Sequence, residues 1–397
     1  MTRIEKPAQR LLFLAFGAWI FLSAFYYAGN FISGDVLADR SSDQFHKAFK
    51  YAAALLFSLL FMLKFRLWSL LLYYVCLFFC LIMFLIIHFS GIQVQHAIDI
   101  TIVLISFSGF VFFISKFDDD ALIRTAKLVV ASALVPSCIS FFEYFFMEPI
   151  LGDYWRNTGG YRSISTLLNP NNFGLYIGAA FLLLVFSDQY TVKRKIITLA
   201  IFLAALLMSG SRTALISLFT ALLFGSVFSG NCSIRLNRLA GWLVAAPSTL
   251  AILTVAIYIF QFELPDRAIN METAFIRIAK YFEYITNFNA SYMIPDSDEK
   301  RIGIVSENSY FHVMNSFGFL FFFLLALITA FFHRPDLSSY RLPAPRRIFG
   351  IVFAYYLVAS FFENVLMSFP NNQLFFIAAG AVFAVRDFAW TNRKRIE

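Results

Sequence analysis

Long apolar runs alternate with short polar segments along most of the chain. A membrane-spanning helix needs roughly 20 consecutive apolar residues, and somewhat fewer where the bilayer is thin. The pattern predicts spanning helices at about residues 11–32, 48–63, 67–88, 98–115, 128–147, 172–187, 196–211, 213–229, 240–260, 310–332, 347–368 and 372–389. We therefore expect an all-α fold, a polytopic membrane helix bundle of about 12 transmembrane helices that forms one integral-membrane domain over residues 1–397.

The composition is typical of a membrane protein. Hydrophobic residues make up 60% of the chain and charged residues 14%, whereas a soluble domain is roughly half apolar and a quarter charged. The net charge of +8 does not indicate nucleic-acid binding, because the basic residues fall between apolar runs. The four cysteines show neither metal-type spacing nor a disulfide framework, so no metal is expected. These cysteines are Cys76, Cys80, Cys138 and Cys232.

The basic residues also predict the orientation of the spans. If the N-terminus lies in the cytoplasm and the spans alternate, every cytoplasmic segment carries at least two Lys or Arg residues. Short cytoplasmic segments of membrane proteins are enriched in these residues. We therefore expect both termini to be cytoplasmic. The first apolar run follows a basic start, as in a signal peptide, but further spans follow at once, so an uncleaved first span is expected.

One arginine interrupts a long apolar run. In "LLMSGSRTALISLF" (206–219), Arg212 is the only formal charge between Ile196 and Gly230. A single helix over 196–229 would be about 51 Å long, against a hydrocarbon core of about 30 Å. The sequence therefore predicts two spans joined by a tight turn at 210–212, on the outer side. An arginine at a helix end can be a simple anchor, but within a membrane bundle it is also a candidate for a functional site.

Two outer segments are too long to be simple turns. The smaller, 148–171, carries Arg156 and Arg162 and ends in Asn-Pro-Asn-Asn, in which Asn169 and Asn172 suit a turn and a helix N-cap. A solvated loop is the alternative for this segment.

The larger outer segment is 261–309. Within it, "METAFIRIAKYFEYI" (271–285) has apolar residues three or four apart, which predicts a helix lying along the membrane surface or packing against the other loop. The segment leads into the next span through Glu307, Asn308, Tyr310 and His312.

Ionisable groups therefore gather on the outer side. Arg156, Arg162, Arg212 and Arg277 suit an anionic group, because the arginine fork matches phosphate oxygens in pairs, although lipid headgroups are anionic too. Nearby carboxylates or a histidine could accept a proton. Glu143 and Glu363 lie near the outer ends of their helices. Each of these groups is alternatively a satisfied polar group at an interface.

Three elements in this order resemble the O-antigen ligase/polymerase superfamily of bacterial envelope proteins. They are "YRSISTLLNPNNFGLYIG" (161–178), "LLMSGSRTALISLF" (206–219) and "SENSYFHVMNSFGFLFFF" (306–323), with one large outer loop between the last two. The resemblance covers about residues 125–385, and the turn with Ser211 and Arg212 is its most specific part.

The resemblance implies an integral-membrane glycosyltransferase of the bacterial inner membrane. Such an enzyme moves a glycan from an undecaprenyl-diphosphate carrier to a glycan or lipid-A-core acceptor on the periplasmic side, inverts the anomeric centre, and needs neither a metal nor another cofactor. Segments 261–309 and 148–171 then become the main and the smaller periplasmic loops. Arg212 matches the family arginine of the turn, and Arg162 matches the arginine before Asn-Pro-Asn. A chain-length regulator is a further expected partner.

The third element departs from the ligase pattern. The ligases usually carry His-Asn where this chain has Glu307-Asn308. The departure favours a polymerase of O-antigen, capsule or exopolysaccharide, with Glu307 or His312 as the proton acceptor, and leaves an O-antigen ligase as the alternative. A lipid-linked glycan transporter or flippase is the alternative of another class. Such folds usually contain repeated halves and polar sites near mid-membrane, which are not evident here. A non-catalytic membrane subunit, with the arginines as anchors, is the last alternative.

Overall fold

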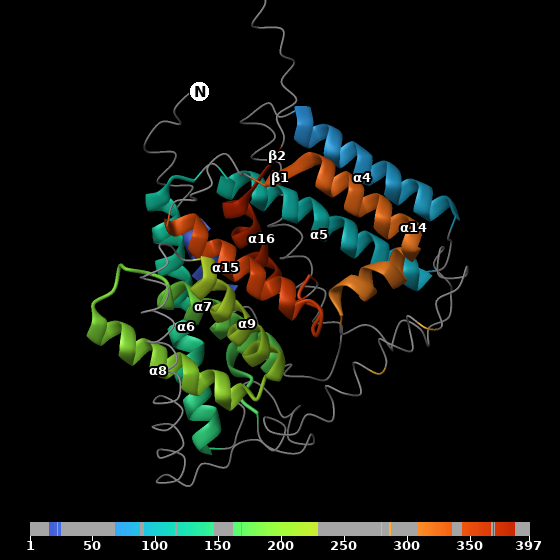
Figure 1. Cartoon of the computed structure of the whole chain (residues 1–397). Coiled ribbons are helices and arrows are strands. Elements are labelled where there is room, and N and C mark those ends of the chain that lie inside the picture. Colours follow the sequence, from blue (N-terminus) through green and yellow to red (C-terminus); the bar gives the residue numbers. More distant parts are fainter. Residues whose placement is uncertain are drawn as a thin grey trace, which may run out of the picture.

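The computed structural model describes residues 16–24, 68–87, 91–146, 162–228, 308–335 and 344–385, except for 22, 116, 168, 367 and 369, together with Ala279 and Thr286. These residues are mostly helical (Figure 1). The helices are α4 Trp68–Ile87, α5 Gly91–Ser115, α6 Asp119–Phe146, the 3-10 helix η2 Ser165–Leu167, α7 Pro170–Val185, α8 Val192–Ser209, α9 Arg212–Phe228, α14 Ser309–Phe332, α15 Ala344–Ala359 and α16 Asn371–Val382.

The described helices follow the predicted apolar runs, with shifted ends. The largest shifts are at α6, which begins nine residues before 128, and at α15, which ends nine residues before 368. Two of the described helices are long and apolar enough to cross a membrane, through Ile98–Ser115 and Asp119–Phe146. The predicted spans 48–63 and 240–260 lie outside the described residues, so the total of about 12 spans stays a prediction.

The described residues agree with the predicted all-α fold, to which two short strands are the only addition in this part of the chain. β1 (His333–Pro335) and β2 (Phe383–Val385) pair antiparallel at the ends of α14 and α16. Three residues are too few to show the alternation of polar and apolar positions that predicts a strand. Residues 383–385 therefore looked like the end of the span 372–389, whereas α16 ends at Val382 and its C-cap Phe383 is extended.

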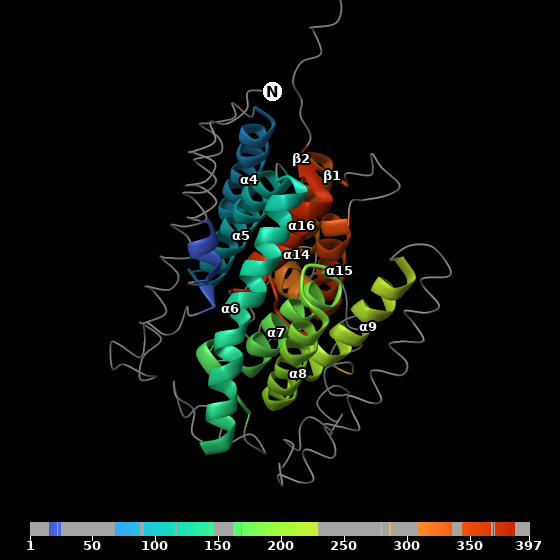
Figure 2. The same ribbon diagram turned by 90° about the vertical axis from the view of Figure 1, so that its left-hand side faces the viewer.

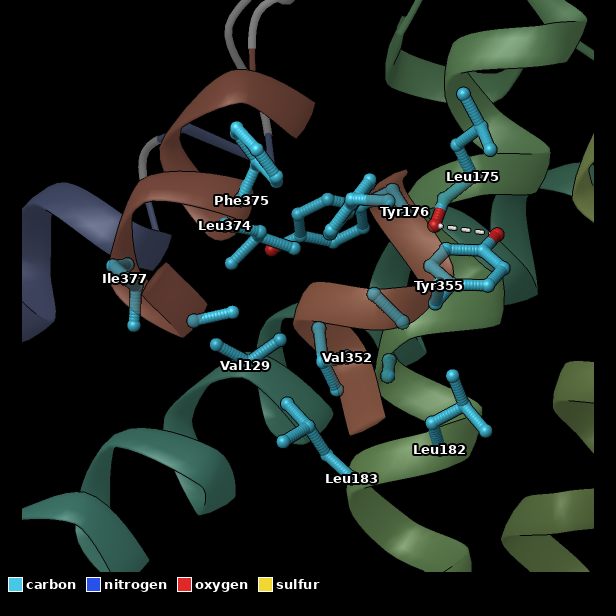
Figure 3. Close-up of a cluster of buried hydrophobic side chains, with 14 of the residues drawn as sticks. Val129, Leu175, Tyr176, Leu182, Leu183, Val352, Tyr355, Leu374, Phe375 and Ile377 are labelled. Carbon is cyan, nitrogen blue, oxygen red and sulfur yellow. Dashed lines mark hydrogen bonds between the residues drawn. The ribbon is translucent and has the colours of Figure 1, made fainter. Parts of the chain in front are cut away.

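The main core surrounds α7. This helix is buried along almost its whole length and packs against α6, α8, α9, α15 and α16. Figure 3 shows how Leu182 and Leu183 of α7, Val129 of α6 and Val352 of α15 meet in this core. A second cluster joins α4, α5 and α14, with Phe84 of α4 buried in it. The α4–α5–α14 layer lies beside the larger bundle, and α5 connects the two through α16 (Figure 1).

A glycine allows an aromatic ring to lie directly on α7. The Tyr355 hydroxyl of α15 donates to the carbonyl oxygen of Leu175 at 3.2 Å (Figure 3). A Cβ at Gly178 would collide with that hydroxyl. The hydrogen bond and the close approach together fix α15 against α7.

α14 consists of two helical pieces. Gly318 has φ 76° and ψ 159°, which interrupts the helix, and the bend is visible in Figure 1. A positive φ of this kind is accessible to glycine at little cost, whereas residues with a Cβ are strained there. The piece after Gly318 packs against α4 through Phe321 and Leu325.

Seven helix ends meet at one end of the larger bundle, which we call the polar end. Hydrogen bonds between them involve the C-terminal ends of α6, α8 and α15 and the N-terminal ends of α7, α9, α14 and α16. The β1–β2 pair and the start of α15 lie at the opposite end, which Figure 2 shows at the top of the view. The polar end is where the candidate site lies.

Candidate functional site

The turn between α8 and α9 forms the centre of the site. Gly210 ends α8 in the left-handed conformation, with φ 57° and ψ 22°, and its N–H donates to Leu207 O at 2.9 Å. Ser211 then caps α9, because its Oγ accepts from Ala214 N at 3.4 Å. The predicted tight turn at 210–212 is confirmed. Arg212 is the first residue of α9 and is half-buried.

Arg162 holds this turn from the side. It is buried, with 6% of its surface exposed. Its Nε donates to Ser209 O at 2.9 Å, and its Nη2 donates to Gly210 O at 3.3 Å. A guanidinium at this position stabilises the partial negative charge of a helix C-terminus. The structure therefore brings Arg162 to the turn of Arg212, as a cap of α8, and its binding of diphosphate stays a prediction.

The Asn-Pro-Asn-Asn stretch begins α7. Asn169 is the N-cap, and its Oδ1 accepts from Asn171 N at 2.8 Å and from Asn172 N at 3.4 Å, while Pro170 occupies the first helical position. The prediction that the Asn-Pro-Asn-Asn stretch caps the following helix is confirmed, and the structure assigns the cap to Asn169. Asn172 contributes its carbonyl oxygen, which accepts from Asn371 Nδ2 at 3.0 Å.

Asn171, which the sequence analysis did not single out, joins two charged side chains. Its Oδ1 accepts from Arg162 Nη2 at 2.7 Å, and its Nδ2 donates to Glu363 Oε1 at 2.7 Å. Thr213 Oγ1 donates to the same carboxylate oxygen at 3.4 Å. Glu363 was predicted only to lie near a helix end, yet it contacts both the start of α7 and the first turn of α9.

The sequence contains one signal for a contact between the starts of α7 and α16. Pro-Asn-Asn occurs at 170–172 and again at 370–372, and both copies stand at the start of a helix. The two copies contact each other through Asn371 and Asn172. The repeat marks residues that close the same end of the bundle.

α7 lies unusually close to the turn at Gly174. A Cβ at this position would be 2.6 Å from Ser211 Cβ and 2.8 Å from Ser209 Oγ. Real Cβ atoms do not approach so closely, so glycine is required for α7 and the α8–α9 turn to pack as they do.

A second carboxylate, Glu143 at the end of α6, is fully buried. Its Oε2 accepts from Ser163 Oγ at 2.6 Å, Ile164 N at 3.1 Å and Ser165 N at 2.7 Å. Ser165 has φ 50°, which is unusual for a residue with a side chain. Three donors on one oxygen compensate the cost of burying the charge. Glu143 therefore fixes the segment that carries Arg162.

The third sequence element reaches the same end through the start of α14. Asn308 Nδ2 donates to Phe361 O at 2.8 Å, and Ser309 Oγ donates to Glu363 O at 3.1 Å. The Tyr310 hydroxyl donates to Leu357 O at 3.3 Å. His312 belongs to the same first turns of α14.

The other predicted site residues lie outside the described residues. These are Arg156, Arg277 and Glu307. Of the loop 261–309, the structure describes Ala279 and Thr286, both in helical backbone, and the last two residues. Among the described residues no group of three or more His, Cys, Asp or Glu side chains is placed to hold a metal ion.

No protein-family model, curated protein or solved structure gives a significant match to the chain. The resemblance drawn from the three sequence elements therefore stays a prediction.

Proposed function

We propose that the protein polymerises undecaprenyl-diphosphate-linked oligosaccharide repeat units of O-antigen, capsule or exopolysaccharide. The reaction is an inverting, metal-independent glycosyl transfer at the polar end of the bundle. The supporting observation is that the three sequence elements of the resemblance, which begin at 161, 206 and 306, are joined there by hydrogen bonds. The first two meet directly, and Glu363 and its loop connect both to the third.

The chemistry requires a cationic site that is partly shielded from water. As the glycosidic C–O bond to the carrier breaks, negative charge grows on the diphosphate. Preorganised donors such as the guanidinium of Arg212 stabilise this charge, because they need no reorganisation during the reaction. Half-burial of Arg212 at a helix N-terminus suits this role, since the helix dipole adds to the attraction for an anion.

The remaining steps concern the acceptor sugar. Its hydroxyl attacks the anomeric carbon, and its proton passes to Glu307 or His312 acting as a general base. A single displacement inverts the carbon, as in single-step glycosidases. His312 belongs to the start of α14, whose Asn308 and Ser309 are tied to the loop after α15.

In the proposed setting, the chain spans the inner membrane about 12 times, with both termini in the cytoplasm. The polar end then faces the periplasm, where the lipid-linked repeat units are joined. Exposed apolar side chains along α4 and α14, such as Phe78 and Phe323, suit contact with lipid or a polyprenyl tail.

The experiment replaces Arg212 by alanine and by lysine. Both variants are expressed in the source bacterium lacking the wild-type gene, their membrane levels are measured, and the length of the surface polysaccharide is followed on gels. We expect single-repeat glycan in both variants, because loss of one preorganised donor lowers the rate by about 10²–10³-fold. Lysine lacks the planar fork and does not replace arginine at such a site.

Arg194→Ala is the matched control, since Arg194 is an exposed basic residue at the opposite end of the bundle. This variant should make wild-type chains. Long chains left on the lipid carrier in the Arg212 variants would instead identify a ligase. Wild-type polysaccharide in both Arg212 variants, at normal membrane levels, would remove the catalytic role of this arginine.

A further inference from the structure

Among the residues that the structure describes, Glu363 contacts all three sequence elements. Its Oε1 accepts from Asn171 of the first element at 2.7 Å and from Thr213 of the second at 3.4 Å. Its carbonyl oxygen accepts from Ser309 Oγ of the third element at 3.1 Å. A single residue of the loop after α15 thus connects segments that are far apart in the sequence.

The neighbours of Glu363 strengthen the same connection. Phe361 O accepts from Asn308 Nδ2 at 2.8 Å, and Ser360 O accepts from Ser309 N at 3.0 Å. Ser309 Oγ also accepts from Leu366 N at 3.3 Å. The loop is therefore fixed to the start of α14 by its backbone, and the carboxylate extends from a firmly held position.

The amide of Asn171 is oriented by the donor and the acceptor between which it lies. Its oxygen faces the guanidinium of Arg162, and its nitrogen faces the carboxylate of Glu363. The opposite orientation would place N–H groups against a cation and an oxygen against an anion. A guanidinium offers only donors and an ionised carboxylate offers only acceptors, so the match of donors and acceptors decides the orientation of the amide. The hydrogen bonds that join Glu363, Asn171 and Arg162 therefore allow only one orientation of the Asn171 amide.

This chain ends on the turn that carries Arg212. Arg162 bonds the carbonyl oxygens of Ser209 and Gly210, while Thr213 bonds Glu363 directly. The turn is held from both sides, and Arg212 lies between the two attachments. Movement of Glu363 would break its bond to Thr213 and remove the partner that orients Asn171 against Arg162.

We propose that Glu363 is a positioning residue, which fixes the Arg212 turn for diphosphate through Asn171, Arg162 and Thr213. This inference rests on the proposed function, because it assumes that the turn binds the diphosphate of the donor. It adds that residue 363 acts through the acceptor oxygen of its side chain. Oε1 of residue 363 has to accept two hydrogen bonds, and its negative charge is not required.

The test measures binding of inorganic pyrophosphate to the purified full-length protein in lipid nanodiscs. Glu363→Ala should weaken binding about tenfold, because the turn that carries Arg212 is then no longer preorganised for the anion. Asn171→Ala should weaken it similarly, and the double variant should be no weaker than either single variant, because both changes break one chain. Glu363→Gln keeps an oxygen for both donors and should bind within about twofold of the wild type.

Two controls separate positioning from general stability. Asp188→Asn removes an exposed carboxylate between α7 and α8, at the other end of the bundle, and should bind like the wild type. Thermal unfolding of each variant is followed with and without pyrophosphate. A purely structural role of Glu363 would lower both midpoints equally and leave the increase caused by pyrophosphate unchanged.

The outcomes distinguish this inference from the proposed function. If the wild type binds pyrophosphate, Arg212→Ala does not, and Glu363→Ala binds normally, the inference alone is wrong. If Glu363→Gln binds as weakly as Glu363→Ala, the acceptor oxygen is not what matters, and the inference is again wrong. If the wild type does not bind pyrophosphate at all, the diphosphate site fails, and the positioning role fails with it.

Discussion

The two ends of the helix bundle differ in whether their charged side chains are buried or exposed. At the polar end, Arg162 and Glu143 are buried, and their side chains form hydrogen bonds with other groups of the protein. At the opposite end, basic side chains are exposed to the surroundings. These are Arg124, Lys127, Lys193, Arg194 and Arg347.

Each end also has an arginine that donates hydrogen bonds to backbone carbonyl oxygens at or near helix ends, so the two arginines can be compared directly. Arg346 donates from Nη2 to Phe117 O at 3.2 Å and from Nη1 to Ala381 O at 3.3 Å. Arg162 makes equivalent bonds to Ser209 and Gly210, and in addition bonds the amide of Asn171. Capping explains the contacts of Arg346 completely. It does not explain the connection from Asn171 to Glu363, which is the feature on which the proposed positioning role of Glu363 rests.

The opposite end contains a buried ionisable group, but one that favours its neutral form. Burial lowers the pKa of His333, and a hydrogen bond from its Nδ1 to Thr329 O at 2.8 Å only partly opposes the shift. The ring lies against Tyr73 and Phe107. Among the described residues, the buried charged side chains are therefore Glu143 and Arg162, both at the polar end, where donors and acceptors surround them.

The largest contrast is expected between two carboxylates. Glu143→Ala should lower the free energy of unfolding by about 3 kcal/mol or more, because three buried donors lose their acceptor. Asp118→Ala, at the opposite end, removes only an exposed cap of α6 on Ala121 N and should cost about 1 kcal/mol. Thermal unfolding of the purified variants in micelles measures both. Equal losses would show that the buried carboxylate does not organise the polar end.

Two helix glycines give the next contrast. Gly174→Ala should destabilise by about 1–3 kcal/mol, because the new Cβ overlaps Ser211 and Ser209 and must move the turn. Gly350→Ala places its Cβ 3.6 Å from Val382, an ordinary contact, and should be neutral or stabilising by up to about 1 kcal/mol through helix propensity. Pyrophosphate binding and unfolding are measured on both. A Gly174→Ala variant that unfolds and binds like the wild type would contradict the close packing of α7 on the turn.

The smallest contrast concerns two helix N-caps. Asn169→Ala removes a side chain that accepts from two backbone N–H groups of α7 and should cost about 1 kcal/mol. Thr191→Ala should change stability by less than about 0.5 kcal/mol, because Thr191 is exposed and makes no capping bond to α8. Denaturant titration resolves the difference. A larger loss of stability for Thr191→Ala than for Asn169→Ala would contradict the expected difference between the two N-caps.

Much of the fold could be predicted from the sequence, because apolar runs and breaks between them are local signals. The turn at Gly210 could be predicted because a single helix over 196–229 would be longer than the membrane core is thick, and because glycine favours a turn. The cap of α7 could be predicted from the Asn-Pro-Asn-Asn stretch alone. The strands β1 and β2 could not be predicted, since each is three residues long and depends on a partner about fifty residues away.

The candidate site was predicted in part for the same reason. Arg162 and Arg212 were singled out by charge within or beside apolar sequence, and the structure brings them to one turn. Asn171 and the loop role of Glu363 were missed, because an asparagine or glutamate near a helix end looks like an ordinary interfacial residue. Their importance depends on contacts between residues 171 and 363, which no local pattern encodes.

The interruption at Gly318 has a consequence for the communication between the two layers of the molecule. Before it, α14 is bonded to the loop of Glu363; after it, α14 packs on α4 through Phe321 and Leu325. Gly318 thus forms a bend between the two helical pieces of α14, which run in different directions. Any residue with a Cβ would favour a straight rod there, and the rod could satisfy the α4 layer or the Glu363 loop, but not both.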